Sequence, residues 1–211
     1  MYDGIIDLSH HNGPRAISGL ETAYKSGIRA VIHKATEGTT FVDKQFRAVR
    51  DEARRLGMLF GSYHFGTASD SIEQAKHYLD IVGPSDGELL ILDLEANSPN
   101  PSSSMFVVGA SFFVGAIRKS TGRTTDSIGL YSRSNYLSRF PSNQNLLNCW
   151  LWLARYNATK EPVVPTGWSS WDLWQFTDKS DIPGIGLCDR SRFRGSYDDL
   201  VTFWQQHTRK G

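Results

Sequence analysis

The sequence has few cysteines and no long hydrophobic run. Cys149 and Cys188 are the only two cysteines, and neither lies in the Cys-x-x-Cys or Cys/His spacing of a zinc site. They could form one disulfide or stay as two buried thiols, so they do not indicate a cellular compartment. No stretch approaches the about 20 apolar residues of a transmembrane helix, and the first residues do not have the pattern of a signal peptide. We therefore expect no membrane insertion and no signal peptide in this sequence.

An excess of either charge is also missing, because 23 Lys and Arg residues stand against 22 Asp and Glu residues. Proteins that bind nucleic acids electrostatically usually carry a basic excess, so nucleic acid is not an expected partner. Glycine-rich phosphate-binding motifs and the Gly-x-Ser-x-Gly nucleophile motif are absent as well. We therefore expect no cofactor and no serine-nucleophile chemistry.

Eight short apolar runs divide the chain, and most of them are continuous rather than alternating. They span residues 4–8, 28–34, 59–65, 88–95, 127–132, 149–154, 171–176 and 185–189. Continuous apolar runs are typical of strands covered on both faces in a parallel sheet. Apolar residues at helical spacing predict helices over 15–26, 43–56, 70–82, 103–120 and 134–140, and one more near 195–207.

Five βα units followed by three trailing strands predict an α/β fold, namely a flattened or incomplete TIM-like β/α barrel. A doubly wound sheet is the alternative arrangement, but eight strands in this order favour the barrel. No internal repeat, low-complexity tract or interdomain linker is visible. We therefore expect a single domain.

The most informative segment is an apolar strand that ends in Asp93 and Glu95. Residues i and i+2 of a strand point to the same face, so the two carboxylates lie side by side, about 7 Å apart at Cα. Burying carboxylates costs several kcal/mol unless they are paired or neutralised, and few structural roles need two unpaired acids. Two acids with different pKa values are what glycosidic bond cleavage requires. The segment therefore indicates a catalytic pair.

Polar and aromatic residues follow the other predicted strands, at the end where β/α barrels carry their active sites. These residues are Asp7, Lys34, Tyr63, Phe65, Tyr131, Trp174 and Asp189. Some have a structural alternative: Asp7 could cap a turn, and Trp174, like Trp152, could belong to the core. Because the segments are independent, their agreement favours a site at this end of the barrel.

His10 and His11 follow the first strand and raise the alternative of a metal site. Zinc-binding barrels usually begin with two histidines one residue apart, whereas adjacent residues in extended backbone face opposite ways. Two histidines with two or three carboxylates could still bind a divalent ion. We expect no metal, and a metal-dependent polysaccharide hydrolase or deacetylase stays open as the alternative.

Seven motifs of the chain resemble glycoside hydrolase family 25, the Chalaropsis-type lysozymes of bacteria, fungi and phage endolysins. In chain order they are residues 4–13 (GIIDLSHHNG), 34–38 (KATEG), 61–65 (GSYHF), 92–95 (LDLE), 151–156 (LWLARY), 171–176 (WDLWQF) and 189–193 (DRSRF). They follow the order of the family along nearly the whole chain. The chain departs from the family pattern at His10, His11 and His33, which concerns subsite preference rather than the reaction.

The resemblance implies a lysozyme, or N-acetylmuramidase, that hydrolyses the β-1,4 bond between N-acetylmuramic acid and N-acetylglucosamine in bacterial peptidoglycan. It implies Glu95 as the general acid/base and Asp93 as its partner carboxylate. Asp7 and Asp189 complete the expected catalytic cluster. The expected substrate-binding residues are Lys34, Tyr63, Phe65, Tyr131 and Trp174.

The mechanism expected for this pair retains the anomeric configuration. Glu95 should hold a proton near neutral pH because of partial burial and repulsion from Asp93, which should stay ionised. Asp93 could attack the anomeric carbon, stabilise the oxocarbenium ion or orient the 2-acetamido group of the substrate. The sequence leaves these three roles open.

The resemblance also sets expectations about organisation and place of action. We expect residues 1–211 to form one catalytic domain without a separate cell-wall-binding module, and to act as a monomer on the cell wall, in the periplasm or outside the cell. Without a signal peptide, release would follow a holin-type membrane lesion, as for a phage endolysin, or a leader would have been trimmed. A catalytically silent peptidoglycan-binding protein is a further alternative, although a buried acid pair disfavours it.

Overall fold

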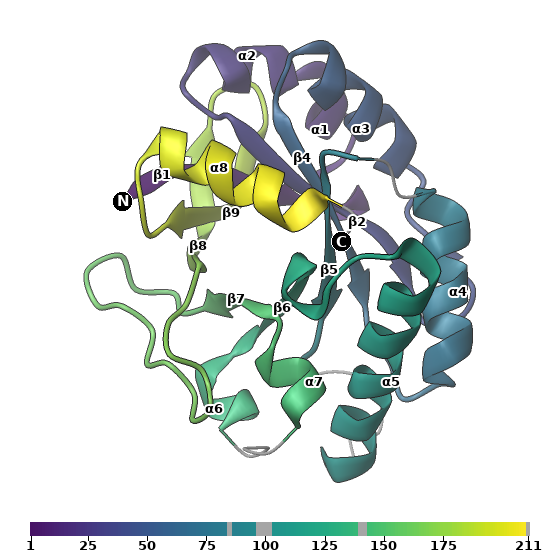
Figure 1. Cartoon of the computed structure of the whole chain (residues 1–211). Helices are drawn as coiled ribbons and strands as arrows, with labels where there is room; N and C mark the ends of the chain where they lie inside the picture. The colour runs from purple at the N-terminus through teal and green to yellow at the C-terminus, as the bar shows by residue number, and fades with distance from the viewer. Residues whose placement is uncertain (84–85, 96–102, 139–142, 210–211) are drawn as a thin grey trace.

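A closed barrel of eight strands forms the centre of the molecule (Figure 1). The computed structural model describes residues 1–83, 86–95, 103–138 and 143–209, and the elements named below lie within them. Around the barrel, the strands are β1 (Tyr2–Leu8), β9 (Gly186–Phe193), β8 (Leu173–Ile182), β7 (Trp150–Ala154), β6 (Ile128–Arg133), β5 (Glu88–Asp93), β4 (Leu59–Phe65) and β2 (Ala30–Glu37). Pairing of β1 with β2 closes the ring. The expected β/α barrel is therefore confirmed.

Seven strands of the barrel run parallel, and β9 runs against them. β9 pairs antiparallel with β8 on one side and with β1 on the other. The β8–β9 hairpin thus replaces the helical crossover that two parallel strands would need. A further short strand, β3 (Phe41–Val42), pairs with the end of β2 outside the ring. Its two exposed residues are too few to show a strand pattern in the sequence.

Helices cover the outside of the parallel strands in the first half of the chain (Figure 1). They are α1 (Arg15–Ser18), α2 (Leu20–Lys25), α3 (Phe46–Arg55), α4 (Ser71–Val82) and α5 (Ser103–Thr121). The boundaries of α4 follow from its sequence. The side chain of Asp70 accepts hydrogen bonds from the first free amides of the helix, and Gly83 ends it in the left-handed conformation with φ of 47°.

The single helix expected over residues 15–26 is divided at Gly19 into α1 and α2. Gly184, in the β8–β9 turn, approaches so closely that a Cβ on Gly19 would lie 2.0 Å from the Gly184 carbonyl oxygen. Only glycine fits such a contact between two backbones. The break therefore reflects a long-range contact that helical spacing does not reveal.

Two short helices lie between β6 and β7. α6 (Ser134–Leu137) confirms the beginning of the helix expected over 134–140, whose last two residues lie outside the described residues. α7 (Gln144–Leu147) was not expected, because a single turn has too few residues to show helical periodicity.

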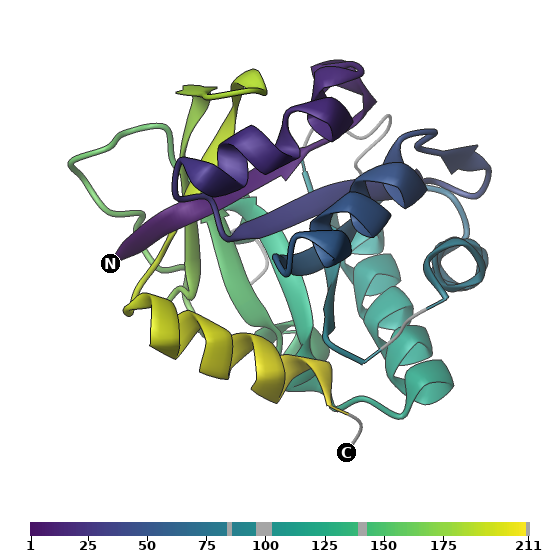
Figure 2. The ribbon, with the colours of Figure 1, turned by 90° about the horizontal axis from the view of Figure 1, so that it is seen from above.

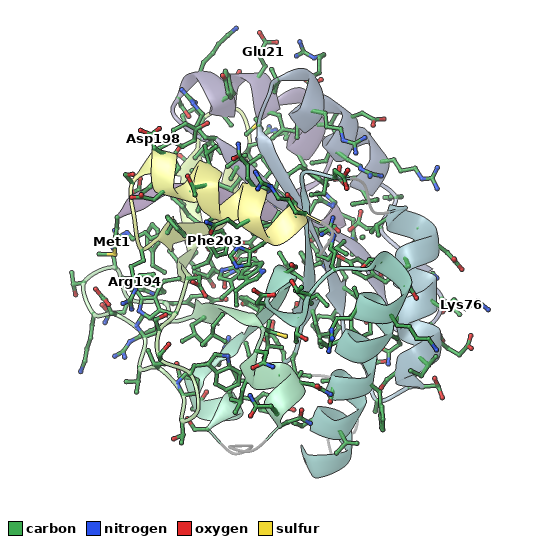
Figure 3. All side chains as sticks on the ribbon, viewed as in Figure 1. Met1, Glu21, Lys76, Arg194, Asp198 and Phe203 are labelled. Atoms are coloured by element: carbon green, nitrogen blue, oxygen red, sulfur yellow. The ribbon has the colours of Figure 1, made fainter. Side chains whose placement is uncertain are left out.

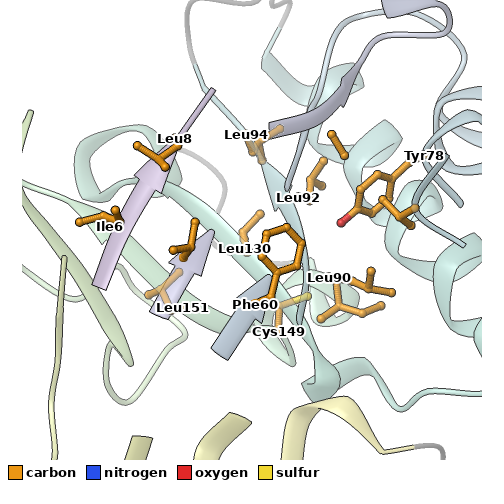
Figure 4. Close-up of a cluster of buried hydrophobic side chains, with 14 of the residues drawn as sticks. Ile6, Leu8, Phe60, Tyr78, Leu90, Leu92, Leu94, Leu130, Cys149 and Leu151 are labelled. Carbon is orange, nitrogen blue, oxygen red and sulfur yellow. The ribbon is translucent and has the colours of Figure 1, made fainter. Parts of the chain in front are cut away.

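Two hydrophobic clusters occupy the two sides of the barrel wall. The outer cluster lies between strands and helices, and Figure 4 shows Leu90, Leu92 and Leu94 contributing to it from β5 and the residue after it. The inner cluster fills the barrel and includes Leu89 and Ile91 of the same strand. The continuous apolar run therefore serves both faces in alternation, as a strand of a covered parallel sheet must.

The last helix, α8 (Tyr197–Thr208), packs on the inner cluster instead of the outer one. It lies across the barrel in Figures 1 and 2, and Phe203 is on its buried side, whereas Glu21 and Lys76 on outer helices point away from the barrel (Figure 3). The indole nitrogen of Trp204 donates a 3.1 Å hydrogen bond to the Phe60 carbonyl oxygen, near the start of β4. α8 therefore covers the amino-terminal end of the barrel and leaves the other end open.

Replacing Trp204 with alanine is expected to lower the free energy of unfolding by about 3–5 kcal/mol, the usual cost of truncating a buried aromatic residue. The Trp204 side chain is only 1% exposed. Phe112→Ala on α5 is the control, because that ring is 60% exposed and its loss should matter by less than about 0.5 kcal/mol. Urea unfolding followed by circular dichroism measures both. Equal effects of the two substitutions would contradict the role assigned to α8.

No helix in the described part of the chain combines the length and the apolar character that crossing a membrane requires.

Cys149 and Cys188 are free thiols, and both are buried. Burial raises the pKa of each thiol to about 12, so neither is a reactive thiolate at neutral pH.

Candidate active site

A pocket of about 170 Å³ opens at the carboxyl end of the barrel. Seven of the barrel strands, or the residues directly after them, supply its walls. The lining residues are Asp7, Tyr63, Asp93, Glu95, Tyr131, Trp152, Tyr156, Gln175 and Asp189. This is the end at which β/α barrels gather their catalytic residues, because the loops after the parallel strands meet there.

Strand alternation directs the acids into the barrel. On β1, Ile5 belongs to the inner cluster, so Asp7 points to the same side two residues later. On β5, Ile91 is an inner residue and Asp93 follows at the strand end. Glu95 continues this alternation beyond the strand and reaches the same pocket. The apolar interior of the barrel thus ends in a layer of carboxyl groups.

Asp189 enters this layer from the opposite chain direction. It lies in the middle of β9 and is paired with Asp7 across the antiparallel β1–β9 ladder. Asp189 lies with the other acids, as expected from the sequence. The sequence, however, predicts it at the end of a parallel strand, and the structure places it within the antiparallel strand β9. An antiparallel strand brings its middle, rather than its carboxyl end, to this level of the barrel.

Asp7 and Asp93 are buried acids, only 7% and 6% exposed. Burial raises the pKa of Asp7 well above its ordinary value, and the negative charges of Asp189 and Glu95 raise it further. Burial also raises the pKa of Asp93, with repulsion from Glu95 added and the Lys34 charge opposing. Among the described residues, Oδ1 of each aspartate has no hydrogen-bond partner. Both oxygens are also almost fully buried, so each aspartate adds an unsatisfied polar atom to the pocket wall.

Glu95 and Asp189 are less buried, and they too favour the protonated form. Burial raises the pKa of Glu95, while the positive charges of Arg133 and Lys34 oppose the shift. Burial raises the pKa of Asp189 to about 6, and Asp178 and Glu95 contribute in the same direction. The pocket therefore binds protons at pH values where ordinary carboxyl groups have lost them.

The charge state expected for Asp93 needs correction. The sequence predicts an ionised Asp93 beside a protonated Glu95, and the raised pKa of Glu95 agrees with the second half of that expectation. Burial, however, raises the pKa of Asp93 as well, because its strand position places it deeper in the barrel. The two acids compete for protons, so they titrate as a pair.

A chain of hydrogen bonds fixes the floor of the pocket. Tyr131 Oη donates to Gln175 Oε1 at 2.7 Å, and Gln175 Nε2 donates to Asp7 Oδ2 at 2.9 Å. Burial and the nearby charge of Asp93 raise the pKa of Tyr131 and of Tyr63 well above 10.0, so both stay neutral phenols. Tyr63 can donate a hydrogen bond to a substrate, and Tyr131, whose single O–H is donated to Gln175, can accept one, in both cases without adding charge.

Lys34 and Phe65 lie beside the pocket rather than in its wall. Lys34 Nζ is 2.6 Å from Glu37 Oε2 and 4.9 Å from the centre of the Phe65 ring. The Lys34 charge lowers the pKa of Asp93 and of Glu95 against the effect of burial. Phe65 pairs with Asp93 across β4 and β5. Contact of either side chain with substrate stays a prediction.

Trp174 does not reach the pocket and is withdrawn from the expected substrate-binding set. It is 1% exposed and packs in the outer cluster, where its indole nitrogen donates to the Arg155 carbonyl oxygen at 2.8 Å. The physical reason is alternation along β8. Leu173 belongs to the inner cluster and Gln175 lines the pocket, so the residue between them points outward.

Three aromatic or amide wall residues, Trp152, Tyr156 and Gln175, were not among the expected site residues. Trp152 is paired with Tyr131 across β6 and β7, and the two rings meet edge to face at 4.6 Å. An inward Tyr131 on the neighbouring strand was the signal that could have identified Trp152. Tyr156 lies beyond the end of β7, where no periodicity indicates a direction.

His10 and His11 do not join the acid layer. His10 Nδ1 lies 2.9 Å from Asp43 Oδ2, and the two histidine rings are 4.0 Å apart. Within the described residues, no group of three or more His, Cys, Asp or Glu side chains is arranged to hold a metal ion. In this part of the chain, the two histidines and the carboxylates therefore do not come together as metal ligands.

Comparison with known families gives one match that covers most of the chain. Residues 6–185 match the model of the glycosyl hydrolases family 25. The matched span contains Asp7, Asp93 and Glu95, and it ends shortly before Asp189.

Curated relatives and solved structures similar to the chain also include lysozymes and muramidases. The chain is 29% identical to lysozyme M1 of Streptomyces globisporus over 93% of its own length and 69% of that protein. It is 29% identical to the N,O-diacetylmuramidase of Chalaropsis sp. over 84% of its length and 89% of that protein. A bacterial lysozyme structure from Streptomyces coelicolor superposes with a TM-score of 0.84 at 26% identity, covering 98% of both chains. Other curated relatives are longer, since the chain spans 50% and 61% of two of them.

Proposed function

The chain belongs to the glycosyl hydrolases family 25 and is thus a glycoside hydrolase, and on this premise we propose that it is a muramidase of bacterial peptidoglycan. The bond cleaved would be the β-1,4 bond between N-acetylmuramic acid and N-acetylglucosamine. The observation that carries the proposal is the layer of four acids in one pocket at the carboxyl end of the barrel. Muramidases and lysozymes among the similar proteins support the choice of substrate.

Glu95 is the proposed general acid/base. Its raised pKa favours the protonated form that must donate to the leaving glycosidic oxygen. It lies beyond the end of β5, at the mouth of the barrel, and is more exposed than Asp93. A group at the mouth can exchange protons with water after each turnover, which a fully enclosed acid cannot do as readily.

Asp93 is the proposed partner carboxylate, and retention of configuration is the proposed outcome. Its carboxyl group lines the pocket, where it can accept a hydrogen bond from the 2-acetamido group of the substrate, or face the positive charge that develops at the anomeric carbon. Burial and repulsion from Glu95 raise the pKa of Asp93, which disfavours the free carboxylate that direct attack requires. We therefore favour the acetamido group as nucleophile, and proton NMR of the first-formed anomer checks retention.

Asp7 and Asp189 are proposed to set the charge of the pocket rather than to react. The Gln175 amide holds Asp7, and both acids raise the proton affinity of their neighbours through their negative charge. Tyr63 is proposed as a hydrogen-bond donor to the sugar and Tyr131 as an acceptor, since its O–H is donated to Gln175. Lys34 and Phe65 are proposed to contact the substrate from the side of the pocket. Trp152 and Tyr156 join this proposed substrate-binding set.

We propose that the barrel works as one catalytic domain, as a monomer and without a resident metal ion, on the cell wall outside the cytoplasmic membrane. Incubation with purified peptidoglycan should release new reducing ends without acetate, and pretreatment with a strong chelator should not change the rate. Acetate without reducing ends would favour a deacetylase, and binding without either product a silent wall-binding protein. A rate lost to the chelator and restored by a divalent ion would favour the metal-dependent alternative.

A further inference from the structure

A second groove of about 410 Å³ adjoins the acid pocket. It lies where β6 passes into α6, at the carboxyl end of the barrel (Figure 1). Its lining includes Arg133, Ser134, Asn135, Ser138, Arg155 and Val163. The groove thus combines two cations with short polar side chains and one exposed apolar residue.

The two arginines of this groove form no salt bridge in the described part of the chain. Within the described residues, neither guanidinium has a carboxylate at salt-bridge distance. Arg155 Nη1 donates to the Glu161 carbonyl oxygen at 3.1 Å, which orients the guanidinium without neutralising it. A planar guanidinium held in this way presents its remaining N–H groups to an incoming carboxylate.

The groove lies beside the acid pocket, next to the ends of β6 and β7. Tyr131 and Trp152 form a pair in the β6–β7 ladder and line the acid pocket, and Arg133 and Ala154 form the pair two residues further along the same strands. The guanidinium carbon of Arg133 lies 5.6 Å from the ring centre of Tyr156, which belongs to the acid pocket. Tyr156 of the acid pocket and Arg133 of the groove thus lie next to each other, at the boundary between the two cavities.

We propose that this groove is a subsite for an anionic peptide attached to the sugar in the acid pocket, with Arg133 and Arg155 binding its carboxylates. The inference rests on the proposed muramidase function, since in peptidoglycan the lactyl group of N-acetylmuramic acid carries a short peptide with free carboxylates. The serine and asparagine side chains can bond to the peptide backbone, and Val163, which is 67% exposed, offers apolar contact. The groove then makes the enzyme prefer glycan strands that still carry their peptides.

The subsite also couples to the proposed catalytic acid. The Arg133 charge lowers the pKa of Glu95. A peptide carboxylate bound to Arg133 offsets that charge, so Glu95 keeps its proton to higher pH when the substrate carries a peptide. The basic limb of the pH–rate profile should therefore lie at higher pH for peptide-bearing glycan than for bare glycan. A role of Arg133 in the fold alone would not produce this dependence on the substrate.

Three soluble substrates of equal glycan length test the proposal: bare glycan, glycan with uncrosslinked peptides, and the same peptide-bearing glycan with its carboxylates amidated. The wild-type protein should show a kcat/KM about tenfold higher on the peptide-bearing strands, which corresponds to about 1.4 kcal/mol. The amidated strands should behave as bare glycan. Arg155→Gln should remove most of the preference, and Arg118→Gln, which removes an exposed positive charge from α5, outside the lining of the groove, should leave it intact.

Each outcome has a distinct meaning. Equal rates of the wild-type protein on all three substrates would overturn the subsite while leaving the muramidase function standing. A preference that survives amidation, or survives Arg155→Gln in a folded protein, would also overturn it. Failure to cleave any of the three would instead contradict the proposed function itself.

Discussion

Replacing Glu95 with glutamine is expected to lower kcat/KM on peptidoglycan by about 10²–10⁴-fold, the usual contribution of a general acid/base. Glutamine keeps the shape of the side chain but can neither donate a proton to the leaving oxygen nor accept one from water. Because burial raises the pKa of Glu95 and favours its neutral form, a neutral amide should disturb the pocket little. The variant should therefore fold normally and still bind glycan.

Glu73→Gln on α4 is the matched control for this loss. It makes the same chemical change at an exposed position that does not line the pocket, so activity should stay at the wild-type level. Thermal unfolding of both variants shows whether each is folded. A folded Glu95→Gln protein with wild-type turnover would disprove the assigned role of Glu95.

Replacing Asp93 with asparagine should lower activity and raise stability at the same time. Loss of one preorganised polar contact to a transition state costs about 10²–10³-fold in rate. The same carboxyl group is buried without an ion-pair partner, so its ionisation at neutral pH opposes folding. Asparagine removes this penalty, and the free energy of unfolding should rise by about 0.5–2 kcal/mol, the usual gain of a stabilising substitution.

The pH dependence of this gain follows from the direction of the shifts. The folded-state pKa of Asp93 and of Asp189 is raised, so over the window between unfolded and folded values the folded protein binds more protons than the unfolded chain. Their contribution to stability is complete below the unfolded pKa of about 4. It is lost as pH rises through the folded pKa, which for Asp189 is about 6. The wild-type protein should lose stability with rising pH, and Asp93→Asn should lose less.

Thermal unfolding across roughly pH 4–8 measures this difference, with Asp80→Asn, an exposed aspartate on α4, as the control. The melting temperatures of wild type and Asp93→Asn should diverge as pH increases, while Asp80→Asn follows the wild type. A variant at Asp93 that is less stable than wild type at neutral pH would show that the carboxylate supports the fold. Full activity of that variant would remove Asp93 from the mechanism.

The acid layer could be predicted from sequence because its key residues obey a local rule. Asp93 and Glu95 share one face by strand periodicity alone, and the buried run before them locates that face in a barrel. The same rule, applied to β8, would have chosen Gln175 over Trp174. On this strand, alternation decides which side chain faces inward, and the aromatic character of Trp174 does not.

Other features depend on contacts that no local pattern encodes. The antiparallel direction of β9 follows from its hairpin with β8, and the break at Gly19 follows from the approach of Gly184. Arg133, the last residue of β6, and Tyr156, beyond the end of β7, come together because the two strands are neighbours in the barrel. Such juxtapositions require the closed barrel, so the groove beside the acid pocket could be recognised only in the structure.

The most direct test of the proposed chemistry is the identity of the sugar at each newly formed reducing end. Purified peptidoglycan is digested, the new ends are reduced with borohydride, and the fragments are identified by mass spectrometry. Cleavage as proposed predicts fragments that end in reduced N-acetylmuramic acid with the wild-type protein and none with Glu95→Gln. Fragments that end in reduced N-acetylglucosamine, or no fragments from the folded wild-type protein, would contradict it.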